Sequence, residues 1–125
     1  MAFSLHGVHV PHRKNTQEQP VVRMEPPKSV TIPMSMHIGA PAKPCVKVGD
    51  LVKVGTLIAE AGGVVSVPMH ASVSGKVTAV QDVKLANGKM APAVTIESDG
   101  EMRQFEGIEP PHIETKEDLI EAVHR

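Results

Sequence analysis

The chain has 125 residues, with 13 basic and 14 acidic side chains, a formal net charge of -1 and only two aromatic residues. It therefore offers neither a basic surface for nucleic acid nor platforms on which bases stack. No apolar run approaches the ~20 residues that span a bilayer, and the start lacks the features of a signal peptide. The single cysteine, Cys45, excludes an internal disulfide or a cluster held by several thiolates of this chain, and it favours a reducing cytoplasmic setting.

Residues 1–28 are rich in proline, histidine and charge, and they predict an arm that packs on the body, with one short strand near residues 3–5. Three of its histidines stand three residues apart, namely His6, His9 and His12. Three histidines can hold a metal ion, but an extended chain points residues at this spacing in different directions. We interpret them as loop histidines.

Residues 29–98 predict the body. Segment 29–33 alternates as a strand and ends at a proline, and 38–44 is a loop. Further short apolar segments separated by glycines are expected as strands at 45–48, 51–54, 56–61, 64–69, 72–80 and 90–97. Asn87-Gly88 predicts the turn of a hairpin. The sequence VKVG occurs at 46–49 and again at 52–55, and this repeat predicts two successive strand-turn units. Many short strands with such turns favour an all-β barrel or sandwich.

Residues 99–125 predict a polar linker and a short helix. Leu119, Ile120 and Val123 recur at helical spacing, and Thr115 is a suitable N-cap. The helix is expected to lead into a further segment of chain.

The stretch VKVGDLVKVGTLIAEAGG (46–63), followed by SGKV (74–77), is similar to biotinyl and lipoyl carrier domains. Carriers attach their cofactor to a lysine at a hairpin tip, where this chain has Gly62 and Gly63 instead. The nearest lysines, Lys53 and Lys76, lie on or beside the flanking strands. We interpret the glycine pair as a tight turn with unusual φ that also permits close approach of another backbone. The tip and the turn at 70–75 are expected to lie close together, which makes six residues a candidate interface: Gly62, Gly63, His70, Ser72, Ser74 and Gly75.

No residues predict a catalytic site or a bound cofactor. Cys45 is interpreted as a small core residue, because no pattern supplies the base that a nucleophile needs. Glu97, Asp99 and Glu101 are interpreted as a solvated charged turn. The glycine-rich motifs that cradle phosphates are absent from the sequence.

Several blocks in one order carry a more specific signal: HGVHVPHRKNT, IPMSMHIGAPAKP, the 46–63 stretch, SVPMHASVSGKV and VTIESDGE. Together they strongly resemble the N-terminal region of the RnfC family, which forms the C subunit of the Rnf electron-transport complex, over nearly the whole chain from Phe3. His6 and Val10 depart from the family's usual Gly-Gly-Val-His-Pro-Pro opening.

The resemblance implies a barrel-sandwich hybrid domain in the NAD(H)-reacting subunit of a membrane-bound, ion-translocating ferredoxin:NAD oxidoreductase. That subunit is implied to be peripheral, on the cytoplasmic face, with FMN, NAD(H) and two 4Fe-4S clusters held beyond Arg125. For this chain it implies a soluble, non-catalytic structural or docking domain. Its implied partners are the remaining domains of the subunit and other Rnf subunits. The alternatives left open are a true carrier and the related N-terminal region of either a cobalamin reductase or the A subunit of a sodium-pumping quinone reductase.

Overall fold

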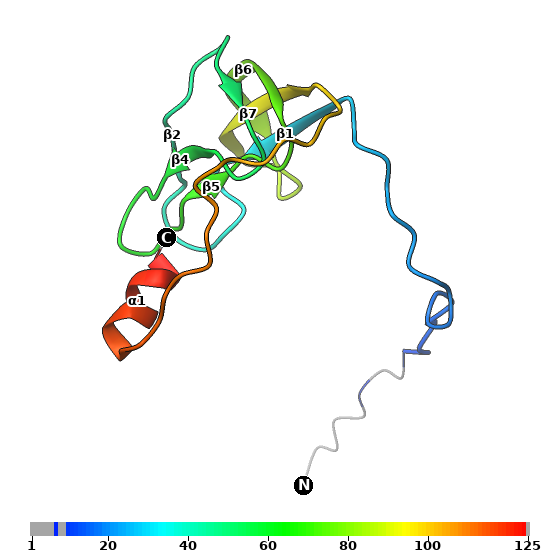
Figure 1. Ribbon diagram of the computed structural model, residues 1–125. Coiled ribbons are helices and arrows are strands. Elements are labelled where there is room, and N and C mark those ends of the chain that lie inside the picture. Colours follow the sequence, from blue (N-terminus) through cyan, green and yellow to red (C-terminus); the bar gives the residue numbers. More distant parts are fainter. Residues whose placement is uncertain (1–6, 8–9, 125) are drawn as a thin grey trace, which may run out of the picture.

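The computed structural model describes Gly7 and residues 10–124, and in that part of the chain it contains β-strands, of which the last two are long, and one helix (Figure 1). The elements are β1 (Ser29–Pro33), β2 (Lys43–Pro44), β3 (Leu51–Val52), β4 (Leu57–Glu60), β5 (Met69–His70), β6 (Gly75–Lys84), β7 (Met90–Ser98) and α1 (Lys116–His124). The prediction of an all-β body with a short C-terminal helix is confirmed.

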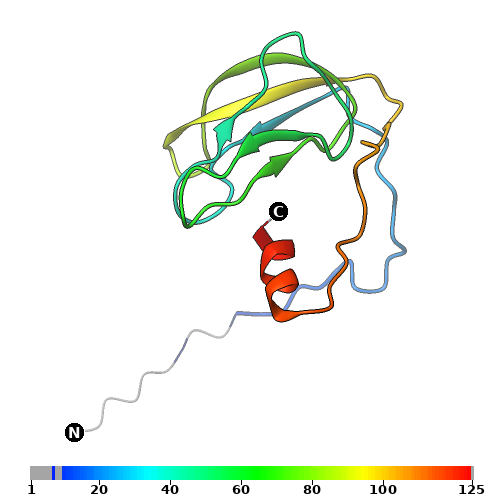
Figure 2. The same ribbon diagram turned by 60° about the vertical axis from the view of Figure 1, so that its left-hand side comes forward.

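The strands form two antiparallel sheets that curl over each other (Figure 2). One sheet has the order β1-β7-β6-β3 and the other β2-β4-β5. Strands β6 and β7 form a hairpin at the centre of the first sheet. The pairing register of β6 against β7 shifts between Val77 and Ala79. Such a bulge bends a strand and increases its twist, which helps this sheet to curve around the core.

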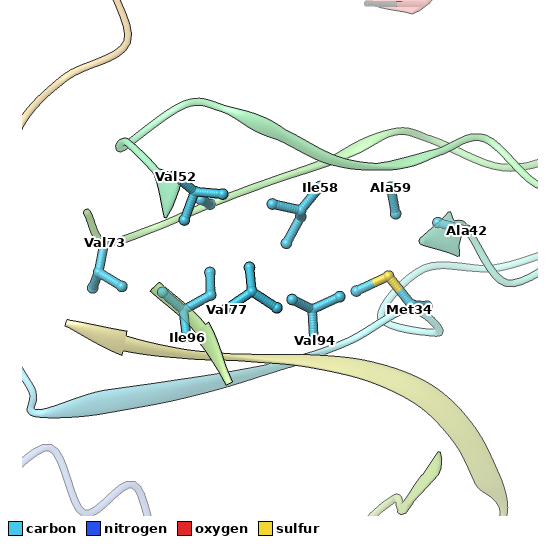
Figure 3. Close-up of a cluster of buried hydrophobic side chains, with 10 residues drawn as sticks. Met34, Ala42, Val52, Ile58, Ala59, Val73, Val77, Val94 and Ile96 are labelled. Carbon is cyan, nitrogen blue, oxygen red and sulfur yellow. The ribbon is translucent and has the colours of Figure 1, made fainter. Parts of the chain in front are cut away.

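The core lies between the two sheets and is entirely aliphatic (Figure 3). Val94 and Ile96 alternate along β7 and have no exposed surface, whereas Thr95 between them is partly exposed. The complete buried cluster comprises Met34, Ala42, Val52, Ile58, Ala59, Ala71, Val73, Val77, Val94 and Ile96. The supply of small β-branched side chains in the sequence is thus what fills the sandwich.

The repeated VKVG units form the same turn twice. The backbone N–H of Lys47 donates to Asp50 Oδ2 at 2.9 Å, and that of Lys53 donates to Thr56 Oγ1 at 2.9 Å. The glycine of each unit has φ of 101° or 89°, a region that favours glycine. The two turns are therefore equivalent, although the segment at 45–48 forms no strand.

Other local predictions can also be compared with the structure. Strand β1 has the expected bounds, and the turn before β7 is closed by a 2.9 Å bond from Gly88 N–H to Leu85 O. Thr115 caps α1 through a 3.2 Å bond from Asp118 N–H to its hydroxyl, while Asp118 Oδ2 accepts from Thr115 N–H at 2.8 Å. These three predictions are confirmed.

Several predicted bounds were wrong: strand β2 lies within the expected loop at 38–44, and segment 51–54 contributes only Leu51–Val52 to a strand. Segment 64–69 contributes only Met69 to a strand, because its backbone is engaged by a neighbouring loop: Ala40 N–H donates to Val65 O at 3.0 Å. Strand β6 begins at Gly75 rather than at 72, because Val73 and Ser74 turn inward at the end of the core, where both are buried. The predicted strand near residues 3–5 lies outside the described residues.

Candidate interaction surfaces at the two ends of the body

Ser74 forms a network at one end of the body that joins two distant turns. Its side chain is fully buried, and its hydroxyl donates to Asp99 Oδ1 at 2.6 Å. The backbone N–H of Arg103 donates to the same hydroxyl at 2.9 Å, and Asp99 N–H donates to Ser74 O at 3.0 Å. Ser74 therefore holds the chain that leaves β7 against the chain that enters β6.

The Asp99 carboxylate accepts further bonds in this network. It receives the N–H of Glu101 at 2.9 Å and the guanidinium of Arg103. These donors, with the Ser74 hydroxyl foremost, lower the pKa of Asp99 from 3.8 to about 2. The interpretation of this segment as a merely solvated turn was wrong for Asp99, because its carboxylate is a bonded structural element.

Gly75 has an internal role beside Ser74. A Cβ at this position would lie 1.9 Å from Glu97 O, and the φ of Gly75 is 154°. The neighbouring strand β7 thus approaches the Gly75 backbone more closely than any side chain allows. The contacts of Ser74 and Gly75 that the structure shows are all within the body, and their contact with another chain stays a prediction.

The glycine pair lies at the opposite end of the body. A Cβ at Gly62 would lie 1.9 Å from Pro41 O, and a Cβ at Gly63 would lie 3.3 Å from the Ala40 methyl. Neither glycine has positive φ, so the expected unusual φ was wrong. The close approach of another backbone is confirmed for Gly62, and that backbone belongs to the same chain.

The expectation that the glycine tip and the turn at 70–75 lie close together was also wrong. Figure 3 shows Val73 and Ala42 at opposite ends of the buried cluster. Ser74 follows Val73 directly, whereas Gly62 lies against Pro41, the residue before Ala42. The six candidate interface residues therefore do not form one patch.

The end that carries the glycine pair presents a surface that we call the apolar tip, made of residues 35–41 and 61–67. Five large apolar side chains are exposed there: Met36, Ile38, Val64, Val65 and Val67. Neither segment contains an aspartate, glutamate, lysine or arginine. Exposed apolar patches without charge are typical of surfaces that another molecule covers.

His70 and Ser72 border two separate apolar grooves. Ser72 lies in a groove of about 620 Å³ together with Val30, Val73 and Met102, with segment 23–27 of the arm as one wall. His70 lies in a groove of about 570 Å³ that is lined also by Leu57, Phe105 and Ile108. Residues 10–26 are nevertheless all exposed, with Val21 100% exposed, so the prediction that the arm packs on the body was wrong for these residues.

The arm histidines show no metal site within the described part of the chain. His12 is exposed, and His6 and His9 lie outside the described residues. Among Gly7 and residues 10–124, no three histidine, cysteine, aspartate or glutamate side chains are grouped so that they could hold a metal ion.

Cys45 is exposed, so its interpretation as a core residue was wrong. Its Sγ lies 3.6 Å from Leu57 O. Partial burial of the thiol, and then the charge of Glu60, raise its pKa, which lowers the fraction of the reactive thiolate. This environment does not activate a nucleophile.

The two lysines nearest to the carrier position are both beside acidic residues. Lys53 forms an ion pair with Glu106, and Lys76 stands opposite Glu97 in the β6–β7 register. Neither lies at the glycine tip. In the described part of the chain, no helix is long and apolar enough to cross a membrane.

Comparison with known proteins places these features in a family. The family model described as the RnfC barrel sandwich hybrid domain matches residues 3–101. The C subunit of the Na⁺-translocating ferredoxin:NAD⁺ oxidoreductase complex of Acetobacterium woodii is 53% identical over 95 residues, which cover 75% of this chain and 21% of the relative.

Other relatives carry related names. The C subunit of the proton-translocating ferredoxin:NAD⁺ oxidoreductase complex of Clostridium ljungdahlii is 41% identical over 82% of this chain and 22% of its own length. The C subunit of the ion-translocating oxidoreductase complex of Klebsiella pneumoniae is 36% identical over 95% of this chain and 16% of its own length. The chain spans about a fifth of the length of these curated relatives.

Proposed function

The chain belongs to the family of RnfC barrel sandwich hybrid domains, and on this premise we propose that it is a non-catalytic docking domain of the C subunit of an ion-translocating ferredoxin:NAD oxidoreductase complex. The observation that carries this proposal is that the two ends of the body differ in their side chains. At one end, Ser74 and Asp99 are hydrogen-bonded to each other, whereas the opposite end exposes the uncharged apolar tip. Such a molecule is suited to packing rather than to chemistry.

The internal network supports the non-catalytic part of the proposal. Ser74 and Asp99 are the residues that most resemble reactive groups, yet the Ser74 hydroxyl is buried and already donates to the carboxylate. The lowered pKa of Asp99 makes it a poor base near neutral pH, because efficient general bases have a pKa close to the working pH.

The proposed parent subunit supplies the cofactors. FMN, NAD(H) and two 4Fe-4S clusters are expected in further domains of a subunit of the relatives' length, and none is assigned to this chain. The parent would be peripheral on the cytoplasmic face of the membrane. The proposed partners are those further domains and neighbouring subunits of the complex.

A carrier function lacks a supporting observation. The backbone of Gly62 packs against Pro41, and no lysine occupies the tip. The alternatives of a cobalamin reductase or the A subunit of a quinone reductase are less well supported, since the three relatives described above are all named as the C subunit of an ion-translocating complex.

Calorimetric titration of the 125-residue chain with NADH and with FMN tests the proposal, after circular dichroism has verified that the chain is folded. We expect no binding heat for either molecule. Saturable binding of either one would contradict a purely structural role.

A further inference from the structure

The two segments of the apolar tip are joined to each other by hydrogen bonds and by direct backbone contact. Ala40 N–H donates to Val65 O at 3.0 Å, and Gly62 N–H donates to Ser66 Oγ at 2.9 Å. At Gly39 a Cβ would lie 1.8 Å from Val65 O, so the two loop backbones touch directly. A surface that is ordered before binding loses little conformational entropy when a partner covers it.

The side chains of the apolar tip point outward and are strongly apolar. Val64 is 100% exposed, Ile38 84% and Met36 67%. Charged residues make up 22% of the whole chain, yet residues 33–42 and 61–75 contain none. A partner with an apolar, uncharged surface therefore matches the tip, since a charged partner would lose hydration without gaining a counter-charge.

One polar atom at the tip also lacks a partner. His37 Nδ1 lies 2.9 Å from Ile38 O, and because a carbonyl only accepts, Nδ1 is the donor. Nε2 of the same ring is buried without a hydrogen-bond partner among the described residues. Because Nε2 is covered by atoms of this chain, a partner on the surface of the tip does not reach it, and it plays no part in the proposed contact.

The path of the chain indicates where that partner comes from. Figures 1 and 2 both place the end of α1 beside the β4–β5 hairpin, whose tip carries Val64. Helix α1 itself exposes three apolar residues, Leu119, Ile120 and Val123. The chain spans about a fifth of its relatives' length, and in a subunit of that length a domain that follows α1 would start on the side of the body where the β4–β5 hairpin lies. Tethering raises the effective concentration of that domain at the tip.

We propose that the apolar tip is the docking surface for the domain that follows α1 in the same polypeptide. This inference rests on the proposed function and makes it specific. The tip and the exposed face of α1 would be covered together, so that the body is fixed against the rest of its own subunit. A membrane surface is less suitable, because the tip has no lysine or arginine to attract anionic lipid and no aromatic anchor.

Photo-crosslinking in the purified full-length subunit tests this proposal. An apolar diazirine amino acid replaces Val64, and the same amino acid at Val48 is the control, since Val48 is 60% exposed but lies outside the tip. Mass spectrometry then maps the adducts. We expect an intramolecular adduct between position 64 and residues beyond Arg125, and no such adduct from position 48.

Other results would overturn the proposal. An adduct of twice the subunit mass would assign the tip to a second copy, and absence of any adduct at position 64 would mean that the tip is uncovered. The same experiment in the assembled complex in membranes distinguishes two further occupants, because an adduct only with another subunit or only with lipid contradicts docking within the chain.

Substitutions provide a second readout. V64E and I38E in the full-length subunit are expected to increase the rate of proteolytic cleavage in the linker at 99–115 by about tenfold, since a charge buried without a partner costs at least ~1.4 kcal/mol. V48E should leave the rate unchanged. An unchanged rate in both tip variants, or an equal increase in V48E, would contradict the proposal. Since both tests use the subunit alone, their failure would leave the proposed role in complex assembly to be judged separately.

Discussion

The hydroxyl of Ser74 donates a 2.6 Å hydrogen bond to the carboxylate of Asp99, and so joins two turns that are 25 residues apart in the sequence. The same hydroxyl accepts the backbone N–H of Arg103. One buried side chain therefore satisfies both the carboxylate and a backbone donor, and it sets the direction in which the chain leaves the last strand.

Replacing Ser74 with alanine should destabilise the fold by about 1–3 kcal/mol, because it removes the donor to Asp99 and leaves the N–H of Arg103 without its acceptor. Urea unfolding followed by circular dichroism measures this change. Ser72→Ala is the matched control, since Ser72 is exposed. Equal stability of the two variants would show that the bond contributes little.

The Asp99 network should make stability depend on pH in the acid range. A folded-state pKa lowered from 3.8 to about 2 stabilises the fold above pH 3.8, and this contribution is lost as the pH falls towards 2. The urea midpoint of the wild type should therefore exceed that of Asp99→Asn near neutral pH, and the difference should shrink between pH 3.8 and about 2. A difference that stays constant over this range would contradict the assignment.

The two glycines of the tip should differ sharply in their tolerance of a side chain. Gly62→Ala places a methyl group 1.9 Å from Pro41 O, and we expect it to cost about 1–3 kcal/mol by forcing the two loops apart. Gly63→Ala meets only the Ala40 methyl, at 3.3 Å, so a small shift accommodates it. Thermal unfolding of both variants tests this, and equal losses would mean that the loop packing is incorrectly described.

Covalent attachment of biotin or lipoate to a lysine would distinguish a carrier from a docking domain. The intact mass of the chain, purified from cells that contain biotin and lipoate ligases, should equal the mass of the unmodified polypeptide, because no lysine occupies the tip. Gly63→Lys supplies the missing residue and serves as the comparison. A biotinyl or lipoyl adduct on Lys53 or Lys76 of the wild type would revive the carrier interpretation.

The parts of the fold that could be predicted from sequence depend on local chemistry. The alternation of residues 29–33, the Asn-Gly turn and the Thr115 cap each act within a few residues, and the structure confirms all three. The family resemblance predicted the barrel-sandwich hybrid, and the family model of that description matches residues 3–101.

The errors arose where the outcome depends on contacts between distant segments. Apolar segment 64–69 has the composition of a strand, but its backbone pairs with Ala40 in another loop. Nothing near Ser74 in the sequence indicates its bond to Asp99, and the expected contact of Ser74 with another chain stays a prediction. One available signal was missed: the absence of charge from residues 61–75 could have indicated the apolar tip.

The most direct measurement removes residues 1–98 from the full-length subunit and assays two properties. We predict that the shortened subunit still oxidises NADH with an artificial electron acceptor, while its co-purification with the other subunits of the complex is lost. Loss of NADH oxidation together with normal assembly would contradict the account, because it would place the body of this chain in the chemistry rather than in docking.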